Sequence, residues 1–111
     1  KSFALRAIKL YASLPKTTEA QVLGKQLLRS GTSVGAHYRE ACRAKSDADF
    51  ISKIEGALQE LDETSYWFEL LIESDIFSAE RMGPLCEEAN ELISVLVTVV
   101  KRVKAKSRSS K

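Results

Sequence analysis

How this chain folds is decided by one stretch, Leu28-Arg29-Ser30-Gly31-Thr32-Ser33-Val34-Gly35-Ala36-His37-Tyr38-Arg39-Glu40-Ala41. It is crowded with Gly, Ser and Ala, although it lies within a segment whose apolar pattern is helical. Each glycine inside a helix costs about 1 kcal/mol relative to alanine. A helix face without side chains offsets this cost when a neighbouring backbone packs directly against it. We therefore expect Gly31 and Gly35, four residues apart and on one face, to lie at a helix interface, where Gly35→Leu would be overpacked.

The helix that contains this stretch is expected to run from Thr17 or Thr18, either of which is a good N-cap, to about Ala44. Small and apolar residues repeat along it every seven positions, as in a bundle seam. That seam consists of Ala20, Leu27, Val34 and Ala41. The alternative is two helices broken at Ser30-Gly31, because glycine weakens a helix.

Three further helical segments are predicted from the apolar spacing. The first runs from about Ser2 to Leu14 and ends at Pro15. The third begins at Ser46, and the fourth runs from after Ser78 to about Val103. The third has spacings of three and four at Ile51, Ile54, Leu58, Leu61, Ser65, Phe68 and Ile72. The fourth continues this spacing at Met82, Leu85, Ala89, Leu92, Leu96, Val99 and Val103.

The connections between these segments are short, which makes consecutive helices antiparallel neighbours. The sequence therefore predicts an all-α fold, an antiparallel up-down-up-down four-helix bundle over residues 1–103. Residues 104–111 contain Lys, Arg and Ser with one Ala and are expected to form a disordered basic tail. No apolar run is long enough for a membrane span, and no signal-peptide pattern is visible. With only two cysteines, these features predict a cytoplasmic protein with free thiols.

Charge is distributed unevenly along the chain. Residues 1–45 carry a net charge of +7, residues 46–100 carry −11, and residues 101–111 carry +6. Opposite charges on the two halves favour attraction between them, within one subunit or between subunits.

Basic residues on one face of the second helix are candidates for contacts with nucleic-acid phosphates. The candidates on this helix and in the basic C-terminal segment are Lys25, Arg29, Arg39, Arg43, Lys101, Arg102 and Lys104. The alternative is that this face neutralises the acidic helices of a neighbouring subunit, at residues such as Glu55, Asp62 or Glu69. We also expect Tyr66, Trp67 and Leu70, which lie off the main seam, to form a subunit interface, because aromatic residues are enriched there.

The titratable residues show no catalytic or metal-binding pattern. His37 is the only histidine, and a di-metal bundle needs paired Glu-x-x-His motifs, so we expect a hydrogen-bonded histidine in the seam. Cys42 and Cys86 have no acid–base partner in the sequence and are expected to act as small buried residues. We predict no enzyme activity, no cofactor, no metal and no small-molecule substrate.

Several strings together resemble a known family, the four-helix-bundle proteins encoded in intervening sequences of 23S ribosomal RNA genes. The resemblance covers nearly the whole chain. It is carried by residues 28–36 with Tyr38-Arg39-Glu40-Ala41, by Ala48-Asp49-Phe50-Ile51-Ser52-Lys53, by Glu60 to Leu71 around Tyr66-Trp67, and by Glu88-Ala89-Asn90-Glu91-Leu92. Family members usually have Asn at the position of His37.

The resemblance implies more about assembly than about activity. Members of the family form pentameric rings. The family is similar to the accessory variability determinant of diversity-generating retroelements, a pentameric bundle whose positive surface binds nucleic acid and a reverse transcriptase. We therefore predict a non-enzymatic homo-pentamer that binds RNA or DNA as an accessory factor. The alternative is a protein-interaction scaffold that does not bind nucleic acid.

Overall fold

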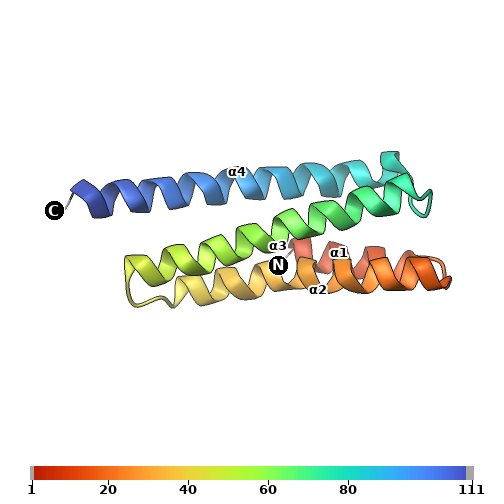
Figure 1. Cartoon of the computed structure of the whole chain (residues 1–111), viewed down its shortest axis with the longest axis horizontal. Helices are drawn as coiled ribbons and strands as arrows, with labels where there is room; N and C mark the ends of the chain where they lie inside the picture. Colours follow the sequence, from red (N-terminus) through yellow and green to blue (C-terminus); the bar gives the residue numbers. More distant parts are fainter. Residues whose placement is uncertain (1, 110–111) are drawn as a thin grey trace.

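A computed structural model describes residues 2–109, all of which lie in four helices or in the short turns between them (Figure 1). Successive helices reverse direction, and the molecule measures 55 × 22 × 19 Å. The fold is therefore the predicted all-α, antiparallel four-helix bundle. The helices are α1 (Ser2–Ser13), α2 (Thr18–Cys42), α3 (Asp47–Glu73) and α4 (Ala79–Ser109).

Hydroxyl side chains cap three of the helices at their N-termini. The Thr17 hydroxyl accepts a hydrogen bond from the Ala20 backbone N–H at 3.3 Å, and the Ser46 hydroxyl accepts one from Asp49 N–H at 3.0 Å. The Ser78 hydroxyl accepts one from the backbone N–H of residue 81 at 3.1 Å. Each cap satisfies a backbone donor that has no partner inside its helix. The predicted starts of α2, α3 and α4 are confirmed.

α2 is continuous through Ser30 and Gly31, so the alternative of two shorter helices is wrong. Its buried face follows the predicted seven-residue repeat from Ala20 to Ala41. The repeat sets a continuous apolar strip against α3, which offsets the helix-weakening effect of the glycines.

The core-facing strip of α3 is rotated slightly from the predicted one. Ile54, Leu61 and Phe68 are buried as expected, and so are Ala57 and Leu71, which the spacing places on one side of that stripe; Thr64 completes the buried face. Leu58, Ser65 and Ile72, the predicted members, are only half-buried. The spacing alone does not separate these two neighbouring strips. Packing against α2 selects the strip that contains Thr64.

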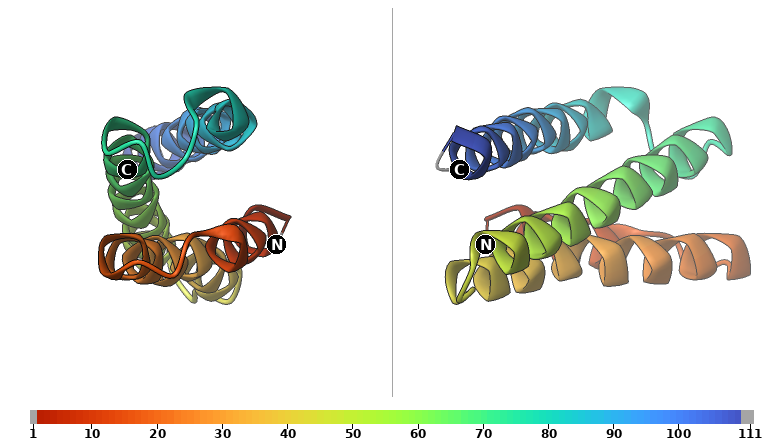
Figure 2. Two further views of the ribbon diagram at one scale, coloured as in Figure 1. Left: turned by 90° about the vertical axis from the view of Figure 1, so that its right-hand side faces the viewer. Right: turned by 60° about the vertical axis from the view of Figure 1, so that its left-hand side comes forward.

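The bundle is not closed on all four sides. Viewed along its length, the chain forms a C in which α1 and α2 make one layer, α3 the back, and α4 the opposite arm (Figure 2). α1 packs on the core through Phe3, whose ring contacts that of Phe68 on α3 edge to face, with centroids 6.5 Å apart. Arg6 of α1 forms an ion pair with Glu88 of α4 across the opening.

The opening follows from helix length. With a rise of about 1.5 Å per residue, the 12 residues of α1 span about 18 Å and the 25 residues of α2 about 37 Å. α1 begins at Ser2, which lies level with Gly35 and Tyr38 because all three residues line one groove. The C-terminal third of α2 is therefore left without a neighbour on its α1 side.

The predicted disordered tail is wrong for residues 104–109, because α4 continues to Ser109. Lys, Arg and Ala are strong helix formers, and cations are stabilised near a helix C-terminus. Lys104 Nζ lies 3.3 Å from Glu55, and the Ser107 hydroxyl lies 3.0 Å from a carboxylate oxygen of Asp47. These contacts hold the segment against α3. Residues 110 and 111 lie outside the described part of the chain.

Candidate nucleic-acid interface and open groove

The C-termini of α2 and α4 bring basic residues to one end of the molecule. α2 and α4 run in the same direction, so both finish at the left in Figure 1. Arg43 and Lys45 follow the end of α2, and Lys101 and Arg102 lie in the C-terminal part of α4. All four are exposed, and none forms an ion pair with another described residue. We call these four residues the basic end.

Two acidic residues near the basic end are occupied by other cations, whereas a carboxylate oxygen of Asp47 accepts a hydrogen bond from the Ser107 hydroxyl. Glu40 pairs with Lys53 at 3.4 Å, and Glu55 pairs with Lys104 at 3.3 Å. Lys104, a predicted nucleic-acid contact, is thus engaged with α3. The four residues of the basic end keep their charge available to an external anion.

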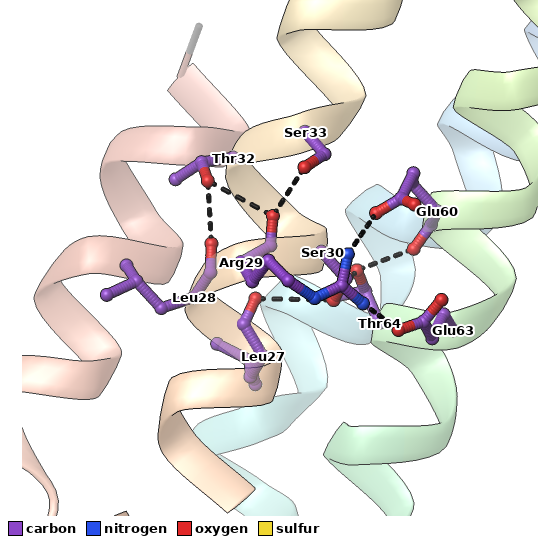
Figure 3. A network of polar contacts seen from close by, with 9 residues as sticks. All are labelled: Leu27, Leu28, Arg29, Ser30, Thr32, Ser33, Glu60, Glu63 and Thr64. Atoms are coloured by element: carbon purple, nitrogen blue, oxygen red, sulfur yellow. Dashed lines mark hydrogen bonds and ion pairs between the residues drawn. The ribbon is translucent and has the colours of Figure 1, made fainter.

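Arg29 lies in a different environment from the basic end. Its guanidinium pairs with Glu60 at 3.3 Å and also with Glu63, both on α3 (Figure 3). Arg29 therefore joins α2 to α3 within one chain, and its side chain remains half exposed. Lys25 is exposed but lies 18 residues before Arg43 on α2, about 27 Å away along the helix. The structure thus separates the predicted basic face into distinct parts.

A buried pair of hydroxyls lies beside Arg29. Thr64 Oγ1 is 2.7 Å from Ser30 Oγ and 2.7 Å from the backbone carbonyl oxygen of Glu60 (Figure 3). Both side chains are fully buried. Sequence reasoning missed this pair. The signal that could have revealed it is Ser30, a serine in the seam of α2. A buried hydroxyl needs a hydrogen-bond partner, which indicates a second polar residue in the facing strip of α3.

The glycines differ in what surrounds them. A Cβ on Gly31 would lie 3.0 Å from Ala7 Cβ, and one on Gly24 would lie 2.6 Å from Leu14 and 2.8 Å from Tyr11. These two glycines allow α1 to approach α2 closely. Gly35 has no such neighbour within 4 Å. The expectation that Gly35 packs against another helix is therefore not met among the described residues.

A groove of about 360 Å³ occupies the open side of the C. Its walls come from the start of α1, from α2 at Val34, Gly35 and Tyr38, and from α4 at Leu92 and Val95. Tyr38 is 52% exposed and Val95 is 57% exposed. The groove thus presents apolar side chains that no other described element covers.

The predicted patch of Tyr66, Trp67 and Leu70 is not uniform. Tyr66 is 52% exposed, whereas Trp67 packs partly against the core and Leu70 is half-buried. The indole N–H of Trp67 is buried without a hydrogen-bond partner among the described residues. Tyr66 lies at a shallow, mostly polar depression. The other residues that line it are Gln59, Asp62, Glu63, Ser65 and Glu69.

The match to known proteins agrees with this architecture. The family model of the 23S rRNA-intervening sequence protein matches residues 1–98. The chain belongs to this family. A crystal structure from Bacteroides thetaiotaomicron, of a protein with unknown function from the S23 ribosomal protein family, is also similar. Its sequence is 42% identical, the match covers 90% of this chain and 93% of that one, and the TM-score is 0.85. No curated protein matches the chain.

His37 packs on α3. A Cβ added to Gly56 would lie 2.9 Å from its Nδ1, so the imidazole rests against a bare helix surface. This Nδ1 is buried and has no hydrogen-bond partner among residues 2–109. The expected hydrogen bond is therefore missing at this atom, because the facing residue has no side chain.

The cysteines and acidic residues supply no reactive cluster in the described part of the chain. Cys42 is exposed, contrary to expectation, because it lies on the uncovered part of α2, while Cys86 is half-buried; both are free thiols. Burial raises the pKa of Cys86, and the negative charge of Glu69 raises it further. Residues 2–107 hold no group of three His, Cys, Asp or Glu side chains placed to bind a metal. Across the described residues, each helix is too short or too polar to cross a membrane.

Proposed function

We propose that this member of the 23S rRNA-intervening sequence protein family is a cytoplasmic, ring-forming binding protein that contacts nucleic acid through its basic end. The observation that carries the proposal is that α2, which Arg43 and Lys45 follow, and α4, whose C-terminal part holds Lys101 and Arg102, finish at the same end of the bundle. Cations without protein partners neutralise backbone phosphates and release the counterions bound to them. A binding role, rather than catalysis, is what such a surface can perform.

Assembly strengthens the proposal because one copy offers few cations. The family resemblance implies a ring of five copies. In a ring with cyclic symmetry, the basic end recurs once per subunit at equivalent positions. Weak contacts on one flexible nucleic acid then act together through a high effective concentration. The proposed ligand is therefore an extended phosphate backbone, RNA or DNA, recognised with little dependence on sequence.

A second candidate function is a protein scaffold that does not bind nucleic acid. The observation that favours it is the use of predicted basic contacts inside the chain. Arg29 is held by Glu60 and Glu63, and Lys104 is held by Glu55. The cations that remain are fewer than the sequence indicates.

Salt-dependent binding distinguishes the two functions. We would titrate structured RNA, single-stranded DNA and duplex DNA by fluorescence anisotropy, at about 50 mM and about 200 mM salt. One variant carries Arg43→Gln, Lys101→Gln and Arg102→Gln. A matched control carries Lys9→Gln, Lys16→Gln and Lys25→Gln, which removes the same charge from exposed positions outside the basic end.

We expect the wild-type ring to bind at the lower salt concentration and to weaken steeply at the higher one. The basic-end variant should bind far more weakly, and its salt slope on duplex DNA should be smaller by about 0.9 for each phosphate that it no longer neutralises. The control should keep most of the wild-type binding. Equal weakening of both variants would show that binding is diffuse and does not use the basic end. If the wild type fails to bind at about 50 mM salt, the scaffold function stands instead.

A further inference from the structure

The groove on the open side of the bundle has apolar walls and a positive rim. It lies between α2 at Gly35 and α4 at Val95. Arg39 stands beside Gly35 and Tyr38 in the depression that continues this wall of α2. No ion pair joins Arg39 to another described residue.

The acidic side chains at this groove are already paired. Glu88, which lines it on α4, pairs with Arg6, and Glu40, near Arg39, pairs with Lys53 at 3.4 Å. The rim is therefore positive overall. The occupant that fits is an apolar side chain flanked by carboxylates.

The chain's own surface contains one such feature. Away from the groove, the large exposed apolar side chains among the described residues are Leu5, Ile8, Val22 and Tyr66. The first three lie among Arg6, Lys9 and Lys25 in the sequence. Tyr66 instead has Asp62 one turn before it and Glu69 one turn after it on α3. We call Tyr66, Asp62 and Glu69 the acidic ridge.

The groove and the acidic ridge are different surfaces of the molecule. α3, the back of the C (Figure 2), carries the ridge, whereas the residues that line the groove come from α1, α2 and α4. A contact between two different surfaces of identical subunits is heterologous, and it propagates from copy to copy until rotation closes it into a ring. A heterologous contact of this kind suits the proposed assembly.

We infer that the acidic ridge of one copy docks in the groove of the next, with Tyr66 against Gly35 and Tyr38, and with Asp62 and Glu69 near Arg39. This inference rests on the proposed ring and names the contact that closes it. The absence of a side chain at Gly35 leaves room for the incoming ring of Tyr66. Of the basic end, Arg43 lines the same depression as Arg39, whereas Lys45, Lys101 and Arg102 do not line it and stay available to phosphates.

Two single-site variants test the contact. Gly35→Trp places an indole in the groove, and its Cβ has room because a Cβ at Gly35 meets no atom within 4 Å. Tyr66→Lys removes the exposed aromatic and brings a positive charge to Arg39. Val22→Lys is the matched control, since Val22 is exposed but lies outside both surfaces. Circular dichroism confirms that each variant is helical, and analytical ultracentrifugation gives its mass.

We expect Gly35→Trp and Tyr66→Lys each to be monomeric alone, and Val22→Lys to keep the wild-type mass. An equimolar mixture of the first two should form a dimer and stop there, because only one intact ridge and one intact groove remain to pair. If either variant alone keeps the wild-type mass, or the mixture stays monomeric, this contact is wrong although the ring stands. A monomeric wild type would instead overturn the proposed ring, and with it this contact.

Discussion

The buried hydroxyl pair Ser30–Thr64 provides a quantitative test of how α2 and α3 are held in register. We would build a double-mutant cycle of Ser30→Ala, Thr64→Val and the two combined. Both side chains are fully buried, and their oxygens are 2.7 Å apart. Val has nearly the shape of Thr, so the second substitution removes polarity rather than volume.

The expected costs follow from the partners that each hydroxyl keeps. In Ser30→Ala, the Thr64 hydroxyl still donates to the Glu60 carbonyl at 2.7 Å, so the loss is one hydrogen bond, about 1 kcal/mol. In Thr64→Val, the Ser30 hydroxyl has only the Leu27 carbonyl, at 3.4 Å. A poorly satisfied buried hydroxyl costs about 1–3 kcal/mol. Removing both hydroxyls leaves no unsatisfied group, so the double variant should be less destabilised than Thr64→Val alone.

Urea denaturation followed by circular dichroism measures the cycle, with all four proteins at one concentration because assembly shifts apparent stability. The cycle should give a coupling free energy of about 1–2 kcal/mol, and Thr64→Val should be the most destabilised of the four proteins. Single effects that add to within about 0.5 kcal/mol would show that the two hydroxyls do not support each other, because independent sites behave in that way.

Three further predictions concern local features of the fold. In a variant kept monomeric by Tyr66→Lys, Gly35→Ala should raise the free energy of unfolding by about 1 kcal/mol. Gly24→Ala should lower the free energy of unfolding, because its Cβ would meet Leu14 and Tyr11. Thermal melts that rank the two variants in the opposite order would contradict this. Asp75 has a φ of 60°, in the left-handed region, so Asp75→Gly should stabilise the turn after α3 by about 1 kcal/mol, and an unchanged melting temperature would disprove the strain. Iodoacetamide at pH 8 should alkylate the exposed Cys42 faster than Cys86. Burial and the charge of Glu69 raise the pKa of the Cys86 thiol, which reduces the fraction present as the reactive thiolate. Mass spectrometry that finds Cys86 modified first would contradict this.

Helix positions and caps were predictable because they depend on local spacing. The seven-residue repeat of α2 and the hydroxyl caps Thr17, Ser46 and Ser78 are features of single segments. The buried strip of α3 depends on which neighbour packs more closely, so spacing placed it one residue away from Thr64. The end of α4 depends on contacts with α3 at Glu55 and Asp47, residues that are about 50 to 60 positions away in the sequence.

The candidate site was predictable only in part for the same reason. Sequence placed the cations on helix faces but could not show that Glu60 and Glu63 lie opposite Arg29. The basic end exists because α2 and α4 finish together, which is a property of topology. That no described residue lies within 4 Å of a Cβ at Gly35 is a tertiary relation, which the pattern of α2 alone does not contain.

Both the proposed nucleic-acid binding and the proposed subunit contact depend on this chain of 12.3 kDa forming a ring. Multi-angle light scattering on the wild-type protein, at micromolar concentration after size-exclusion chromatography, measures its mass directly. We predict a single species of about five times the chain mass, the number of copies that the family resemblance implies. A single species at the mass of one chain would contradict the ring.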